Sequence, residues 1–209
     1  MRLPATGSRI RYNDRMKNNA AKLKIGVLVS GRGSNLQAII DASASGVLNA
    51  ETAVVISDKP DAPALRRIEG IAPGVVIERK AYPTGEAFDS AIADVLEEHG
   101  VELVVLAGFM RVLGSAFIQR FRGRVINVHP SLLPSFPGLH AQRQALLHGV
   151  KISGCTVHLV DETLDGGPIL AQIAVPVLSN DTENSLSERI LKEEHVLLVR
   201  AIREIINKC

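Results

Sequence analysis

The sequence predicts an α/β fold: a doubly wound, mostly parallel twisted sheet with helices on both faces and an antiparallel C-terminal strand addition. Strand-like apolar runs alternate with helical patterns as far as residue 128. The run over 103–107 is continuously apolar, as expected for a central strand covered on both faces. Beyond residue 150, two strand-like runs follow each other across a short connection, which favours an antiparallel pair.

The first predicted unit is a strand over 24–30, a glycine loop over 31–33 and a helix that starts near Asn35. Apolar residues recur at helical spacing after the loop. The same order then repeats, so we expect parallel strands joined by crossover helices. The further predicted elements up to residue 128 are strands over 52–57, 75–78, 103–107 and 125–128 and helices over 64–69 and 86–99.

The pattern changes after residue 128, where three prolines within eight residues predict an irregular loop before a short helix near 141–147. Strands over 153–160 and 168–177 then flank an acidic connection. The chain closes with an amphipathic helix from about Thr182, and Asp181 or Thr182 is available as its N-cap.

Composition indicates one folded domain. A chain of 209 residues with 46% hydrophobic residues can bury one sizeable core, which we assign to residues 23–209. The apolar runs are much shorter than the roughly 20 residues that span a bilayer, so we expect no membrane association. Cys155 and Cys209 show no disulfide or metal-site spacing, which favours a reducing, cytoplasmic location and predicts no metal.

Charge is unevenly distributed. Residues 1–24 hold seven Lys or Arg residues against one acidic residue and so carry +6, which leaves −4 for the rest of a chain whose formal charge is +2. A mildly acidic body with 3% aromatic residues argues against a nucleic-acid surface. Residues 1–22 resemble an organelle transit peptide, but a disordered leader ahead of a second start at Met16 is the simpler interpretation.

Four segments follow predicted strands at the edge where open parallel sheets bind ligands. The first is the loop from Ser30 to Asn35, where backbone N–H groups at a helix start favour an anion such as phosphate, although an ordinary tight turn would look similar. The second, over 108–113, could line an apolar slot with Arg111 facing an anion, or Met110 and Leu113 could simply pack the next helix.

The third segment places Asn127 and His129 on the same side of a strand end. An amide donor and an imidazole in one pocket could stabilise an oxyanion and move a proton near neutral pH. The alternative is a buried histidine bound to a backbone carbonyl. The fourth segment, over 161–168, is acidic and could be a solvated turn, or it could hold a carboxylate near His129 that favours the protonated imidazole.

Together, GRGSN at 31–35, LAGFMRVL at 106–113, INVHPSLLPSFPGLH at 126–140 and LDGGPIL at 164–170 resemble the phosphoribosylglycinamide formyltransferase family of purine biosynthesis. The similarity runs from Lys24 to the final helix. HPSLLP alone is shared with other folate-dependent formyltransferases, whereas the GSN loop and the GLH after the prolines point to the glycinamide enzymes. The resemblance implies the formyltransferase fold and transfer of a formyl group from 10-formyltetrahydrofolate to the amine of 5-phosphoribosyl-glycinamide, in a monomer or weak homodimer.

The resemblance also implies residue roles. Asn127, His129 and Asp165 match the catalytic positions. The phosphate and ribose of the substrate would be bound by Gly33, Ser34, Asn35 and Glu194. The folate pocket would be formed by Met110, Arg111, Val112, Leu113, Asn127, Asp161, Glu162, Thr163, Leu164 and Asp165.

The sequence departs from the family at two positions. Gly85 stands where the family usually has an arginine, so one folate or phosphate contact must be absent or replaced. Leu191 stands where a basic residue is expected, and Lys192 beside it lies on another helix face.

Other functions remain open. One is a formyltetrahydrofolate hydrolase, or another formyltransferase that shares HPSLLP. Another is a nucleotide-binding oxidoreductase, although Asp58 at the end of the second strand is more simply part of a turn than a ribose ligand. A non-catalytic folate-binding protein is the last.

Overall fold

The computed structural model describes residues 21–208. Most of the predicted leader over 1–22, and Cys209, lie outside the described residues. The first secondary-structure element within residues 21–208 is the strand β1 (Leu23–Val29), and the last is the helix α5 (Glu183–Lys208). No helix in this part of the chain has both the length and the apolar character needed to cross a membrane.

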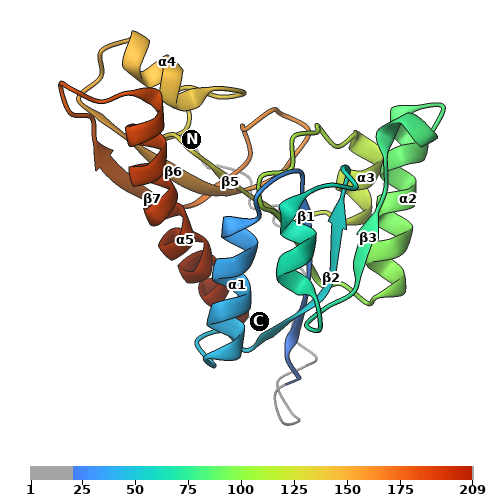
Figure 1. Cartoon of the computed structure of the whole chain (residues 1–209). Helices are drawn as coiled ribbons and strands as arrows, with labels where there is room; N and C mark the ends of the chain where they lie inside the picture. Colours follow the sequence, from blue (N-terminus) through green and yellow to red (C-terminus); the bar gives the residue numbers. More distant parts are fainter. Residues whose placement is uncertain (1–20, 209) are drawn as a thin grey trace, which may run out of the picture.

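A seven-stranded sheet forms the centre of the molecule, in the order β3-β2-β1-β4-β5-β6-β7 (Figure 1). The first five strands are parallel to one another; β6 is antiparallel to β5 and β7 is antiparallel to β6, which gives the predicted antiparallel addition. The strands after β1 are β2 (Ala50–Ser57), β3 (Gly74–Val76), β4 (Leu103–Leu106), β5 (Val125–His129), β6 (Ile152–Leu159) and β7 (Ile169–Pro176).

Helices cover both faces of the sheet because the strand side chains alternate. On β1, Ile25 and Val27 join the core under α1 and α5, whereas Leu28 joins the core under α2 and α3. α1 and α5 lie side by side over one face (Figure 1). The helices other than α5 are α1 (Ser34–Ala44), α2 (Gly85–Glu98), α3 (Ser115–Arg120) and α4 (Ala141–Leu147), with 3₁₀ turns η1 (Pro63–Ile68) and η2 (Arg79–Ala81).

Two predicted elements differ in detail from the structure. The helix expected over 64–69 is the 3₁₀ turn η1, which begins at Pro63 because proline fits the first helical position. The strand expected over 75–78 ends at Val76, since only three residues pair with β2 before the chain turns into η2. The short helix α3 has no counterpart among the predicted ranges.

The start of α5 settles which residue caps this helix. Ser185 donates its backbone N–H to Thr182 Oγ1 at 3.2 Å, and Thr182 donates its own N–H to Ser185 Oγ at 3.0 Å. This reciprocal pair is a capping box. Asp181 instead binds Arg189 through both carboxylate oxygens, at 2.7 and 2.8 Å, and this hydrogen bonding lowers the pKa of Asp181.

Thr182→Ala is expected to lower the free energy of unfolding by about 1 kcal/mol, because α5 loses the acceptor for an N-terminal N–H group. Denaturant unfolding would measure the loss. Thr182→Ser keeps the hydroxyl and is the matched control. Equal stability of the Ala and Ser variants would show that the cap contributes nothing.

Candidate functional site

His129 is the buried centre of a polar cluster at the carboxyl end of β5. Its Nε2 lies 2.9 Å from the carbonyl oxygen of Phe136, and because a carbonyl only accepts, Nε2 carries a proton. Its Nδ1 faces Asp165 Oδ2 at 3.5 Å. Because Nε2 already carries a proton, a second proton on Nδ1 would make the ring an imidazolium whose Nδ1–H points toward this carboxylate.

Asp165 comes from the connection between β6 and β7 and has a left-handed backbone, with φ of 51°. Its Oδ2 accepts the Gly138 N–H at 2.8 Å, and its Oδ1 lies 3.5 Å from Asn127 Nδ2. The His158 imidazole is the largest cause that lowers the pKa of Asp165; burial opposes it, and the Gly138 N–H and His129 reinforce it. Asp165 is therefore ionised at neutral pH although its side chain is 9% exposed.

The proline-rich loop after β5 positions both members of this pair. It supplies the Phe136 carbonyl to His129 and the Gly138 N–H to Asp165. The loop contains a cis peptide at Leu133–Pro134 and is fastened to β6 by Thr156, whose Oγ1 donates to the Ser131 carbonyl at 2.7 Å and accepts the Leu133 N–H at 3.0 Å. The imidazole and the carboxylate are thus held by one segment.

The structure brings together the three residues predicted to be catalytic, and their predicted proximity is correct; their roles remain predictions. It also adds His158, which the sequence reasoning missed. His158 is opposite Asn127 in the antiparallel register, its Nε2 is 3.2 Å from Asn127 Nδ2, and the same nitrogen is 3.7 Å from Asp165 Oδ1. A histidine inside an otherwise apolar predicted strand was the available signal, but only the strand register shows which residue it faces.

The glycine loop leads from β1 into α1, where Gly33 is the N-cap with φ of 70°. No side chain caps this helix start, so its first N–H groups are available to an external acceptor. Asn35 Nδ2 donates to Glu194 Oε2 of α5 at 2.8 Å. This hydrogen bond connects two of the residues that are predicted to bind the ribonucleotide. Burial raises the pKa of Glu194, and the bond from Asn35 opposes this.

The residues of the two predicted folate segments, 110–113 and 161–165, are mostly exposed. Met110, Val112 and Leu164 are exposed, whereas Leu113 is 8% exposed and packs in the core under α2 and α3. The remaining members Asp161, Glu162 and Thr163 are also exposed, and the Thr163 N–H is bound by Asp161 Oδ1 at 2.8 Å.

Arg111 is already paired in the structure. Its Nε donates to Asp58 Oδ2 at 2.9 Å, and the Asp58 side chain is 1% exposed. Asp58 is therefore a buried partner of the 108–114 loop, and the interpretation of it as a simple turn residue was incomplete. This carboxylate is committed to a guanidinium, which further weakens the alternative of a dinucleotide ribose ligand.

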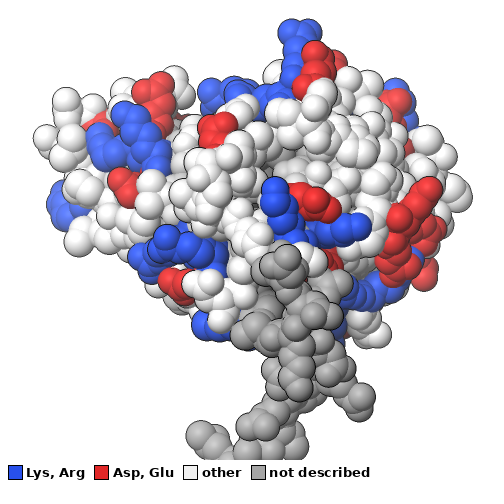
Figure 2. Space-filling model, turned by 90° about the horizontal axis from the view of Figure 1, so that it is seen from below, with Lys and Arg blue, Asp and Glu red and all other residues white. Residues whose placement is uncertain are grey.

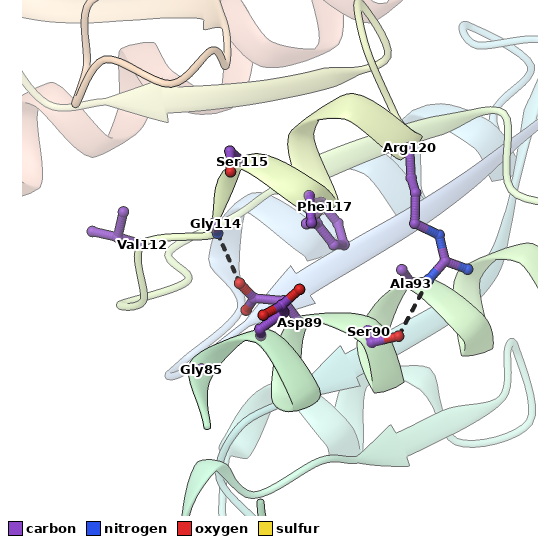
Figure 3. A pocket seen from close by; sticks show the side chains of 11 residues that line it. Gly85, Asp89, Ser90, Ala93, Val112, Gly114, Ser115, Phe117 and Arg120 are labelled. Carbon is purple, nitrogen blue, oxygen red and sulfur yellow. Dashed lines mark hydrogen bonds between the residues drawn. The ribbon is translucent and has the colours of Figure 1, made fainter. Parts of the chain in front are cut away.

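A cavity of about 460 Å³ opens between α2 and α3 (Figure 3). Gly85 and Val112 lie on its wall, so the position where an arginine was expected is open. A Cβ at Gly85 would meet no atom within 4 Å, which means that the space for a longer side chain exists. Asp89 lines the same cavity and accepts the Gly114 N–H at 2.7 Å, and burial raises its pKa. At the other position where the sequence departs from the family, Leu191 is half-buried, and the neighbouring Lys192 is exposed.

Acidic and basic side chains are intermingled on the face seen in Figure 2. Within residues 21–208, no group of three or more His, Cys, Asp or Glu side chains is arranged to hold a metal ion. The polar cluster around His129 contains an amide donor, two imidazoles and an ionised carboxylate.

Comparisons with known proteins show the family to which this fold and site belong. Residues 23–202 match the formyl transferase family, and the chain belongs to that family. It is 42% identical to phosphoribosylglycinamide formyltransferase of Bacillus subtilis over 88% of this chain and 94% of that protein.

A solved structure, glycinamide ribonucleotide transformylase 1 from Symbiobacterium toebii, matches with a TM-score of 0.89 and 49% identity over 91% of this chain and 90% of that one. The trifunctional purine biosynthetic protein adenosine-3 of Drosophila melanogaster is 48% identical over 88% of this chain. The present chain spans only 14% of the length of that trifunctional protein.

Proposed function

We propose that this chain transfers the formyl group of 10-formyltetrahydrofolate to the amine of 5-phosphoribosyl-glycinamide, giving formylglycinamide ribonucleotide and tetrahydrofolate for purine biosynthesis. The observation that carries the proposal is the cluster of Asn127, His129 and Asp165 at the same edge of the sheet as an uncapped glycine loop. The relatives that match over most of their length bear the name of this activity, which supports the same choice.

The chemistry follows from the groups present. The substrate amine attacks the formyl carbon, a new C–N bond forms, and negative charge develops on the formyl oxygen. Asn127 Nδ2 and the protonated imidazole of His129 donate to that oxygen. The intermediate then breaks the bond from carbon to the folate N10, and the proton lost by the amine is delivered to N10.

Asp165 acts in both steps of this reaction. As a carboxylate beside His129 Nδ1 it lies opposite the positive charge of the protonated ring that stabilises the oxyanion. Its distance of 3.5 Å from Nδ1 is longer than an ordinary N–H···O hydrogen bond, so the nitrogen can share its proton with a third group. Asp165 also helps to carry the proton from the amine toward N10, through a water molecule.

The phosphate of the ribonucleotide is assigned to the N–H groups around Gly33, Ser34 and Asn35, and its ribose to Glu194. The folate is assigned to the exposed residues of the 108–114 and 161–165 segments. The buried position of Leu113 makes it a supporting residue of the first segment rather than an exposed contact.

The test is the rate of tetrahydrofolate formation by the purified chain with and without ribosyl-glycinamide. We expect rapid release only when the acceptor is present. Release at the same rate without it would indicate a hydrolase, and folate binding with no release under either condition would indicate a binding protein.

A further inference from the structure

The glycine loop does not fix its own conformation. Gly33 occupies a left-handed backbone position, and no side chain caps the start of α1. Glycine can adopt this left-handed conformation, but it has no strong preference for it, because it adopts many backbone conformations in the unfolded chain. The geometry that presents the loop N–H groups must therefore be imposed by a neighbouring segment.

That segment is η1, which holds the loop by two carbonyl groups. The Ala64 N–H donates to the Gly31 carbonyl at 3.1 Å, and Arg67 Nε donates to the Arg32 carbonyl at 2.7 Å. Arg67 Nη1 also reaches Gln37 Oε1 on α1 at 3.1 Å. A single guanidinium thus binds the loop before Gly33 and the helix after it.

The peptide geometry gives these bonds a direction. In a trans peptide the carbonyl and the following N–H point to opposite sides. Because η1 takes the Gly31 and Arg32 carbonyls, the N–H groups of Arg32 and Gly33 are turned away from η1. The packing is close, since a Cβ added to Gly33 would lie 2.6 Å from Ala64 Cβ and 3.5 Å from Arg67 Cδ.

Arg67 also acts toward α5, the helix that carries Glu194. The pKa of His195, the next residue on α5, is lowered first by burial and then by the positive charge of Arg67. Its hydrogen bonds place the guanidinium between the glycine loop and α1, and its charge also acts on α5. These are the three elements to which the proposed function assigns the phosphate and ribose.

We propose that Arg67 is a positioning residue for the phosphate of the ribonucleotide substrate. It holds the glycine loop with its N–H groups turned outward and places a fixed positive charge behind them, without itself needing to touch the phosphate. This inference rests on the proposed function. It adds a residue from outside the glycine loop to those that determine how the substrate phosphate is bound.

The test compares Arg67→Met and Arg67→Lys with Arg66→Met, which removes an exposed neighbouring cation. Arg67→Met is expected to raise KM for ribosyl-glycinamide about tenfold, while kcat and KM for the folate change by less than about threefold. Arg67→Lys should recover part of the loss, because an ammonium can bind the Arg32 carbonyl but lacks the fork that also reaches Gln37. Arg66→Met should behave as the unmodified chain.

Binding of inorganic phosphate, followed by competition or by thermal stabilisation, separates this inference from the proposed function. If the chain proves inactive with ribosyl-glycinamide, weaker phosphate binding by Arg67→Met would still support the positioning role. An unchanged KM and unchanged phosphate affinity in Arg67→Met would overturn it, as would equal rises in the KM values of both substrates. If Arg67→Met does not fold, the same criteria apply to Arg67→Lys.

Discussion

Asp165→Asn is expected to lower kcat by about 10²- to 10⁴-fold, the range typical of lost acid–base catalysis, with little change in the KM of either substrate. The amide is neutral, so no negative charge faces His129 Nδ1 while the ring stabilises the oxyanion. The backbone should survive the change because asparagine adopts left-handed conformations readily, and its side-chain oxygen can still accept the Gly138 N–H.

Steady-state kinetics with each substrate varied in turn would measure this effect. Asp94→Asn, which neutralises an exposed carboxylate on α2, is the matched control and should leave kcat unchanged. A large rise in KM with an unchanged kcat for Asp165→Asn would contradict the catalytic role and would make Asp165 a binding residue instead.

The effect of Asp165→Asn on the free energy of unfolding should also depend on pH. The folded-state pKa of Asp165 is lowered, so its ionised form stabilises the fold fully above the ordinary Asp pKa. That contribution is lost as pH falls through the lowered folded pKa. The stability difference between the unmodified chain and Asp165→Asn should therefore be largest near neutral pH and shrink in acid.

Gly33→Val is expected to raise KM for the ribonucleotide by tenfold or more while sparing folate affinity. Two causes combine: valine is poorly tolerated at a φ of 70°, and its Cβ would come within 2.9 Å of the Ala64 backbone. The loop must move away from η1, which disturbs the N–H groups that we assign to the phosphate. A stability loss of about 1 to 3 kcal/mol should accompany the change.

Gly46→Val is the control that separates the backbone strain of a positive φ from the displacement of the loop by a steric clash. Gly46 has a φ of 76°, but a Cβ there would meet no atom within 4 Å. This variant should lose stability and keep both KM values. If Gly33→Val instead lost folate affinity and kept the ribonucleotide, the two half-sites would be reversed.

Much of the fold was predictable because periodicity reports burial directly. Continuous apolar strands and amphipathic helices identified the doubly wound sheet, and the short acidic connection identified the antiparallel pair of β6 and β7. The 3₁₀ form of η1 was not predictable in the same way, because a six-residue turn that begins with proline has the same apolar spacing as a short α-helix.

The site was only partly predictable for a similar reason. Asn127 and His129 share a strand, so alternation alone placed them together, and resemblance supplied Asp165. His158 and the Asp58–Arg111 pair depend on contacts between segments far apart in the chain. Arg67 was also missed, because nothing in an arginine within a surface turn indicates that it binds a carbonyl 35 residues earlier.

The most direct test of the central claim follows the formyl carbon itself. The chain would be supplied with 10-formyltetrahydrofolate labelled in the formyl group, together with ribosyl-glycinamide, and the products would be separated and analysed by mass spectrometry. We predict that the label appears in formylglycinamide ribonucleotide, in a one-to-one ratio with tetrahydrofolate, and that Asp165→Asn suppresses its appearance. Recovery of the label as free formate, with the ribonucleotide unlabelled, would contradict the account.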